Sequence, residues 1–223
     1  VDIGNGTWAI GRRDVAYRGD VRQARGMADF VRIDMSNGER TEFLSGLRRP
    51  MGTSPDGAWY VYLAEEQVHA MELATLEDHN LSERAGVDFV NREFDLVAEA
   101  PAHGVAGWTE DGSVLLYDRW DIWDVPLEGG DVVNVTGGAG DADDIRYRVV
   151  PLDPEADYVD PEGALLSAYG EWTKQSGYVR ARPGRAPGNL PLQADKGRQR
   201  CCPAERPPRT LLARHSALDA LCG

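Results

Sequence analysis

Short apolar runs separated by turn residues recur along the chain from Val1 to Ala181. Residues 30–35 alternate apolar and polar side chains, which is the period of a half-buried strand. Residues 59–63 (Trp-Tyr-Val-Tyr-Leu) are aromatic and β-branched without interruption, as in a buried strand. Turn signals bound these runs: Asn37-Gly38 follows the first, and Ser54-Pro55-Asp56-Gly57 precedes the second. The pattern predicts an all-β protein built from hairpins.

The hairpin units repeat, and the repeat covers whole units rather than single turns. The turn Asp56-Gly57 returns as Asp111-Gly112. The segments that follow these turns match as well. Residues 68–73 correspond to 122–127, and residues 80–82 correspond to 134–136, at the same offset in sequence. An earlier copy comprises residues 30–35 and 43–44, which match 68–73 and 81–82. Such copies are typical of β-propeller blades, and one antiparallel sandwich is the alternative.

The rest of the first half follows from the same reasoning. Residues 1–11 are expected to open in a strand, residues 14–17 to form a second strand, and residues 19–29 to form a loop. Residues 67–73 are predicted as a strand, because they fall inside the repeat. Residues 84–103 are an insertion relative to the other copies. Extra residues in a repeat often form a loop on the binding face, and a plain connecting excursion is the alternative.

The second half continues the strand-and-turn pattern. In the hairpin at residues 118–123, the charged residues Asp118, Arg119 and Asp121 are expected to tie the turn. Residues 137–144 lack the Gly and Glu that a calcium loop needs at its sixth and twelfth positions, and they are expected to form a solvated loop.

Further strands and a loop are predicted beyond residue 144. They are a strand at 145–152, a turn-rich loop between the Asp-Pro pairs at 153–154 and 160–161, and the start of a fourth blade at 165–169 and 177–180. The predicted fold class is therefore all-β, a partial β-propeller of three to four antiparallel blades in an open arc, with an irregular C-terminal tail.

The chain changes character near residue 181. Residues 182–223 carry eight Lys and Arg against three Asp and Glu, a net charge of +5, and they contain all three cysteines, six of the thirteen prolines and no aromatic residue. We therefore divide the chain into a partial propeller domain, 1–181, and an irregular or disordered basic tail, 182–223. The tail is either a native segment that folds back or binds a partner, or the product of an out-of-frame coding sequence.

Net charge restricts the classes of partner. The whole chain has a net charge of −13, and subtracting the +5 of the tail leaves −18 for residues 1–181. So acidic a surface argues against nonspecific binding to nucleic acid or to an anionic membrane. No apolar run approaches the roughly 20 residues of a membrane helix. The chain begins with Val1, so the sequence leaves the compartment open.

A family resemblance rests on two stretches of the repeat. They are Ser54-Pro55-Asp56-Gly57, and the longer, more specific run Ala106-Gly107-Trp108-Thr109 with Val114 to Trp123 (Val-Leu-Leu-Tyr-Asp-Arg-Trp-Asp-Ile-Trp). The sequence resembles the N-terminal propeller of bacterial prolyl-oligopeptidase-like serine peptidases over roughly residues 5–181. The short turn alone also occurs in TolB-like propellers.

The resemblance implies a function for the chain. In that family a propeller caps an α/β-hydrolase domain with a Ser, Asp, His triad and limits access to peptides. The chain would then be a non-catalytic propeller portion, and its partners would be peptide substrates and the hydrolase domain, which lies outside this sequence. The alternatives are a propeller module for protein–protein interaction and a small enzyme with an unrecognised site.

The residues themselves nominate no catalytic, cofactor or metal site. No G-x-S-x-G elbow occurs, and Ser54, Ser113, Ser167 and Ser176 are expected in turns or strands. The histidines do not have metal-ligand spacing; His69 is expected in a strand, His79 near a turn, His103 in a loop and His215 in the tail. Neither a cofactor nor a metal is predicted.

Overall fold

The computed structural model describes residues 2–3, 6–19 and 26–187. The secondary structure of these ranges is mostly strand, arranged in four antiparallel sheets with few helical turns, which confirms the all-β class. The chain divides into two compact units, residues 1–118 with 125–132 and residues 119–124 with 133–223. Most of the tail, 188–223 with His215, lies outside the described part, so the predicted boundary at 181 stays a prediction.

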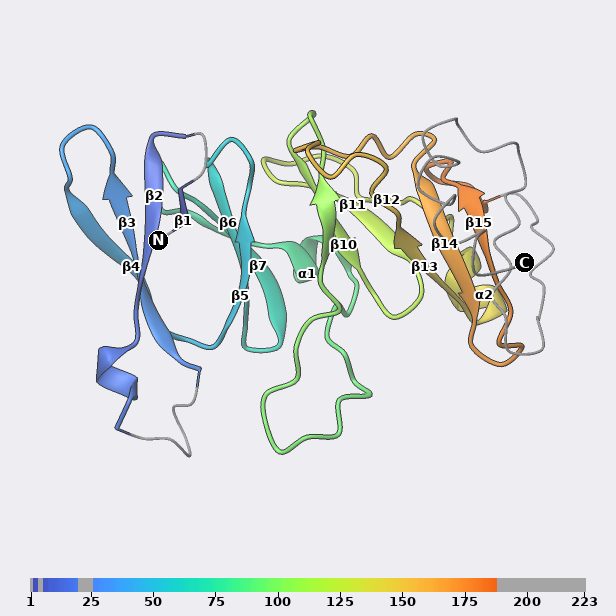
Figure 1. The fold of residues 1–223 in the computed structure, drawn as a ribbon, viewed down its shortest axis with the longest axis horizontal. Coiled ribbons are helices and arrows are strands. Elements are labelled where there is room, and N and C mark those ends of the chain that lie inside the picture. Colours follow the sequence, from blue (N-terminus) through green and yellow to red (C-terminus); the bar gives the residue numbers. More distant parts are fainter. Residues whose placement is uncertain (1, 4–5, 20–25, 188–223) are drawn as a thin grey trace, which may run out of the picture. The chain divides into compact units, whose positions relative to one another are not determined.

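The first two sheets belong to the first unit and have four strands each, in the orders β1-β2-β3-β4 and β5-β6-β7-β8 (Figure 1). Their strands are β1 (Asp2–Ile3), β2 (Trp8–Arg13), β3 (Ala28–Asp34), β4 (Arg40–Leu47), β5 (Arg49–Thr53), β6 (Trp59–Ala64), β7 (Gln67–Glu72) and β8 (Asp78–Asn80). The predicted strands at 30–35 and 67–73 are confirmed as β3 and β7. The predicted hairpin across Asn37-Gly38 joins β3 to β4.

Side chains of these two sheets form one core. The cluster contains Ile10, Ala28, Phe30 and Leu47 from the first sheet, and Tyr60, Tyr62, Met71 and Leu73 from the second sheet and the residue after it. The rings of Phe30 and Tyr60 lie 5.5 Å apart. A guanidinium nitrogen of Arg32 donates to the carbonyl oxygens of Leu73 and, at 2.9 Å, of Ala74. Apolar burial therefore holds the two sheets together, and one arginine adds a directional link.

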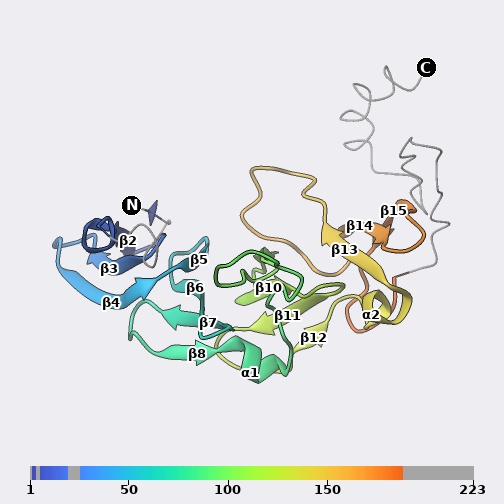
Figure 2. The same ribbon diagram turned by 90° about the horizontal axis from the view of Figure 1, so that it is seen from below.

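The remaining sheets have the strand orders β12-β11-β10-β9 and β13-β14-β15. Their strands are β9 (Val105–Trp108), β10 (Ser113–Tyr117), β11 (Ile122–Pro126), β12 (Val133–Asn134), β13 (Ile145–Val149), β14 (Leu165–Gly170) and β15 (Ser176–Arg180). The predicted strands at 165–169 and 177–180 are confirmed as β14 and β15, and the strand predicted at 145–152 is present as β13 but ends at Val149. The predicted loop between the Asp-Pro pairs joins β13 to β14 and leaves the sheet as a wide arc (Figure 2).

Hydrogen bonds repeat at the sequence offset of the aligned copies. Leu73 donates its backbone N–H to Ala58 O at 2.8 Å, and Leu127 donates to Gly112 O at 3.2 Å. The offset of 54 residues that matches 68–73 to 122–127 also separates the two donors and the two acceptors, although the Asp-Gly dipeptides of the turns match at 55. The turns before β6 and β10 are alike but differ in length by one residue. The side-chain oxygens of Ser54 and Thr109 accept from the backbone N–H of Trp59, five residues on, and of Ser113, four residues on, at 2.9 and 3.0 Å. The sequence repeat is therefore accompanied by a similar, though not identical, pattern of hydrogen bonds.

One turn type closes three of the hairpins, at residues 34–39, 72–77 and 170–175. In each, the last residue's carbonyl accepts from the first residue's N–H, at 2.9 Å in all three. The fifth residue has a positive φ: +76° at Gly38, +62° at Leu76 and +57° at Lys174. Only the first of these positions carries the glycine that this conformation favours.

Three segments are helical where the sequence did not predict a helix. Residues 14–17, predicted as a strand, contain the 3₁₀ turn η1 (Val15–Tyr17), in which Tyr17 donates its N–H to Asp14 O at 3.0 Å. The repeat assigned residues 81–82 to a blade, but they begin α1 (Leu81–Ala85). Residues 137–144, predicted as a loop, contain α2 (Ala139–Asp143). All three are single turns, too short for hydrophobic periodicity to reveal.

Candidate functional site

The serines weighed as nucleophiles have structural roles. The Oγ of Ser54 donates to a carboxylate oxygen of Asp56 at 2.5 Å. Ser167 lies in β14 and donates to the carbonyl of Arg148 at 3.3 Å. Ser113 and Ser176 begin β10 and β15. These positions agree with the turn and strand placements predicted from the sequence.

A hydrogen-bonded cluster crosses three strands of the second sheet. The phenol of Tyr62 donates to Asp78 Oδ1 at 2.6 Å, and His69 Nδ1 lies 2.9 Å from Asp78 Oδ2. The Tyr62 and His69 rings stack, with centroids 5.4 Å apart. Burial and the Asp78 carboxylate raise the pKa of Tyr62 above its ordinary value. Tyr62 therefore stays a hydrogen-bond donor at neutral pH, and the cluster pins β6, β7 and β8 together.

His79 lies in β8, two residues after the turn at 72–77, and belongs to a second polar cluster. Its Nδ1 atom is 3.3 Å from a guanidinium nitrogen of Arg84, and its ring meets Trp59 edge-on at 5.2 Å. Arg84 also donates to the carbonyl oxygens of Pro126 and, at 3.0 Å, of Leu127. The arginine can only donate, so His79 Nδ1 accepts. This cluster ties α1 to the end of β11 within the first unit.

A buried carboxylate organises the second unit. Asp121 is 1% exposed and accepts hydrogen bonds from the Thr136 hydroxyl and from the backbone N–H groups of Gly140, at 2.9 Å, and Asp141, at 3.2 Å. These donors come from the start of α2 and the residues before it. The predicted tie of Asp121 to Asp118 and Arg119 within the hairpin turn stays a prediction. Burial raises the pKa of Tyr147 to about 12, and the Asp121 charge adds to the effect.

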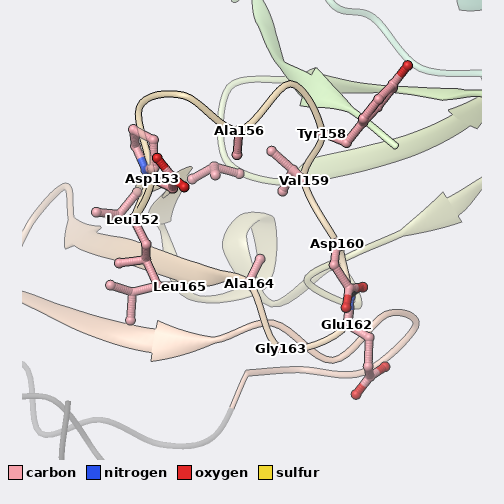
Figure 3. A pocket seen from close by; sticks show the side chains of 13 residues that line it. Leu152, Asp153, Ala156, Tyr158, Val159, Asp160, Glu162, Gly163, Ala164 and Leu165 are labelled. Atoms are coloured by element: carbon pink, nitrogen blue, oxygen red, sulfur yellow. Dashed lines mark hydrogen bonds between the residues drawn. The ribbon is translucent and has the colours of Figure 1, made fainter. Parts of the chain in front are cut away.

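The described part of the chain has a hollow beneath the loop between β13 and β14. The hollow has a volume of about 330 Å³, and its lining runs from Val149 to Leu165. Ala156 and Val159 from the loop and Ala164 from the opposite side point into it, while Asp160 and Glu162 lie along one side (Figure 3). An apolar floor with carboxylates at its edge has the composition of a small ligand pocket.

The loop is shaped by its own turns. The side chain of Asp153 accepts from the backbone N–H of Glu155, and that of Asp160 from Glu162, both at 2.9 Å. Val150 donates to Leu165 O at 2.8 Å and so extends the β13–β14 pairing into the loop. These bonds fix the loop's two ends and leave its middle arched over Leu165, which is buried.

The insertion in the first unit is a second exposed feature. It begins at the end of α1 and contains an isolated bridge between Val90 and Ala102, and Figure 1 shows it projecting beyond the strand ends. Arg49 donates to the carbonyl of Glu99 and lies over the ring of Phe94 at 5.8 Å. The tip exposes Leu96 and Val97, which are 66% and 109% exposed.

Comparison with protein-family models gave no match, and comparison with curated proteins gave none either. In residues 2–3, 6–19 and 26–187 no group of three or more His, Cys, Asp or Glu is arranged to hold a metal ion. Within the same ranges, neither helix is long and apolar enough to span a bilayer. Of the features above, the hollow beneath residues 150–164 is the candidate binding site.

Sequence reasoning recognised the loop at the candidate site but not the hollow. One signal was present: residues 149–165 contain five carboxylates and no Lys or Arg, interleaved with Val, Leu, Ala and Pro. Acidic residues in a turn-rich segment are ordinary at a surface. The apolar floor comes from β14, and its position beneath the loop is a tertiary relationship.

Proposed function

We propose that residues 1–181 are propeller blades of a prolyl-oligopeptidase-like serine peptidase. Each four-stranded sheet is one blade, and the sheet of β13, β14 and β15 belongs to a fourth. In this proposal the chain has no catalytic role; it limits the access of peptides to a separate α/β-hydrolase domain outside this sequence.

The observation that carries the proposal is the repeated hydrogen bonding of the second and third sheets. Donors and acceptors at equivalent positions of the aligned copies are what repeated blades require. A sandwich with hairpins that resemble one another by chance would not repeat the bond from Leu73 to Ala58 at Leu127 and Gly112. The shared core of the first two sheets also supports it, because adjacent blades bury their faces against each other.

The test begins with the coding DNA that flanks the chain. A peptidase gene encodes a G-x-S-x-G elbow downstream, followed by Asp and His in that order. If the intact protein carries this triad, deleting residues 1–181 is expected to let the hydrolase cleave a folded protein that the intact enzyme spares. The proposal fails if no frame encodes the elbow, or if the deletion leaves the size selectivity of substrates unchanged.

The insertion favours a second candidate, a TolB-like propeller module for protein–protein interaction. Its exposed Leu96 and Val97 stand on a loop that Arg49 holds in place, which suits a contact surface. A fluorophosphonate probe tests both candidates against the third, a small enzyme. Both predict that purified residues 1–223 stay unlabelled, whereas labelling would identify a nucleophile within the chain.

A further inference from the structure

We propose that the hollow beneath residues 150–164 binds a peptide segment in which an aliphatic side chain stands next to a lysine or arginine. The aliphatic side chain would enter the hollow, and the cation would lie among the loop carboxylates. This goes beyond the proposed function, because it assigns a ligand to this unit and holds for either candidate parent protein.

The size of the hollow selects the ligand. Its volume of about 330 Å³ is at the lower end of ligand pockets, which range over roughly 300–1,000 Å³. One aliphatic side chain and its neighbouring backbone fit this space, whereas a dinucleotide or a large cofactor does not. Most lining residues, among them Val149, Ala156, Val159 and Leu165, have apolar side chains, which favours an apolar inserted group.

Charge complementarity decides what stands beside the inserted group. The five carboxylates of this stretch are Asp153, Glu155, Asp157, Asp160 and Glu162. Arg180 lies at this end and donates to Gly163 O at 3.0 Å, and Arg148 precedes the lining residue Val149 in β13, so the carboxylates outnumber the arginines near the hollow. An anionic ligand would meet net repulsion here, and a cation would be attracted.

A bare metal ion fits the site less well than a peptide. No three carboxylates in the described ranges converge on one point, and one oxygen of Asp153 and of Asp160 already accepts a backbone N–H. A lysine or arginine on a flexible stem can approach dispersed carboxylates singly, without a fixed coordination geometry.

The test uses the full chain, Val1 to Gly223, and the probe acetyl-Leu-Lys-amide, followed by amide chemical shifts. We expect saturable shifts confined to residues 149–165, with weaker binding of acetyl-Ser-Lys-amide and acetyl-Leu-Glu-amide. The inference is overturned if the probe does not bind, if the serine peptide binds equally well, or if spermidine or calcium gives the same shifts at lower concentration.

Matched variants distinguish the effect of the carboxylates that line the hollow from the effect of the loop's negative charge in general. Asp160→Asn with Glu162→Gln removes two carboxylates that line the hollow, whereas Glu155→Gln with Asp157→Asn removes two from the same loop that do not. The first pair is expected to weaken the probe about five-fold, as two exposed ion pairs would, and the second pair by much less. Asparagine at 160 keeps an oxygen for the turn. Equal losses in both pairs would mean simple charge attraction and would overturn the inference.

Filling the hollow gives an independent check. Ala156 is exposed on the loop, so Ala156→Phe adds a ring to the hollow without replacing a buried side chain. In this variant, the peptide probe is expected to cause no amide shift changes in residues 149–165, while the amide spectrum of β14 and β15 is retained. Full binding by a folded Ala156→Phe protein would contradict the inference.

Discussion

The carboxylate of Asp121 accepts the backbone N–H of Gly140 at 2.9 Å, although the two residues are distant in sequence. The contact leaves no room for a side chain at Gly140. A Cβ built there would lie 2.6 Å from Asp121 Oδ1 and 2.9 Å from the carbonyl oxygen of Ile145. The glycine is therefore required by the close approach of a buried carboxylate, not by its φ.

We expect Gly140→Ala to destabilise the protein by about 1–3 kcal/mol, because the Cβ would force the buried carboxylate and α2 apart. Urea unfolding followed by circular dichroism measures the change. Gly19→Ala is the matched control: a Cβ there meets nothing within 4 Å, and the change is expected to be small. Equal stability of the two variants would show that Asp121 does not constrain α2.

Two hydroxyls at equivalent repeat positions give a paired prediction. Ser82 Oγ accepts the N–H of Val68 at 2.9 Å, and Thr136 Oγ1 lies 3.5 Å from the N–H of Ile122. Ser82→Ala leaves the buried Val68 donor unpaired and is expected to cost about 1–3 kcal/mol. Thr136→Val is expected to cost more, because Thr136 also donates to Asp121.

Urea unfolding tests this pair against Ser45→Ala. Ser45 is exposed and donates to Glu42 on the surface of β4, so its loss is expected to stay within about 0.5 kcal/mol. A Thr136→Val protein as stable as the wild type would mean that this hydroxyl does not support Asp121.

The strands were predictable because their signals are local. The alternation at 30–35 and the unbroken apolar run at 59–63 are properties of a few neighbouring residues, and β3 and β6 lie there. The start of α1 also had a local signal that the repeat alignment obscured. Asn80 caps the helix by accepting the Glu83 N–H at 3.0 Å, and Gly86 ends it with a φ of +62°.

Other features depend on contacts distant in sequence. The short helix α2 is held by Asp121, and nothing in the glycine-rich, acidic residues 137–144 indicates that partner. The contacts of Asp121 with residues 136–141 were missed for the same reason, because its neighbours in sequence give no sign of these donors. The hollow beneath the β13–β14 loop likewise exists because Leu165 lies beneath the loop, and the local sequence does not show this placement.

The stability of the protein is expected to fall at alkaline pH because of Tyr147. Its pKa rises to about 12 in the folded protein, above the ordinary value of about 10 in the unfolded chain. The contribution of Tyr147 to the free energy of unfolding is therefore fully present below about pH 10. It is lost as the pH rises towards 12, because the phenol ionises first in the unfolded state. Tyr62, whose pKa is also raised, contributes in the same direction.

Tyr147→Phe is expected to make this loss shallower, because one of the tyrosines with a raised pKa is then missing. Urea unfolding midpoints measured from about pH 9 to about pH 12 give the slope. If the phenylalanine variant loses as much stability per pH unit as the wild type, the Tyr147 phenol ionises equally in the folded and unfolded states. That result would refute the prediction.

The insertion tip is expected to loosen when Arg49 is removed. Arg49→Ala deletes both the hydrogen bond to Glu99 O and the contact over Phe94. Thermolysin, which cleaves beside exposed aliphatic residues, is expected to cut near Leu96 and Val97 several-fold faster in the variant. Arg40→Ala is the matched control, because it removes one positive charge from an exposed position in β4. Equal cleavage rates in both variants would mean that the loop keeps its conformation without the arginine, and that contacts such as the Val90–Ala102 bridge suffice.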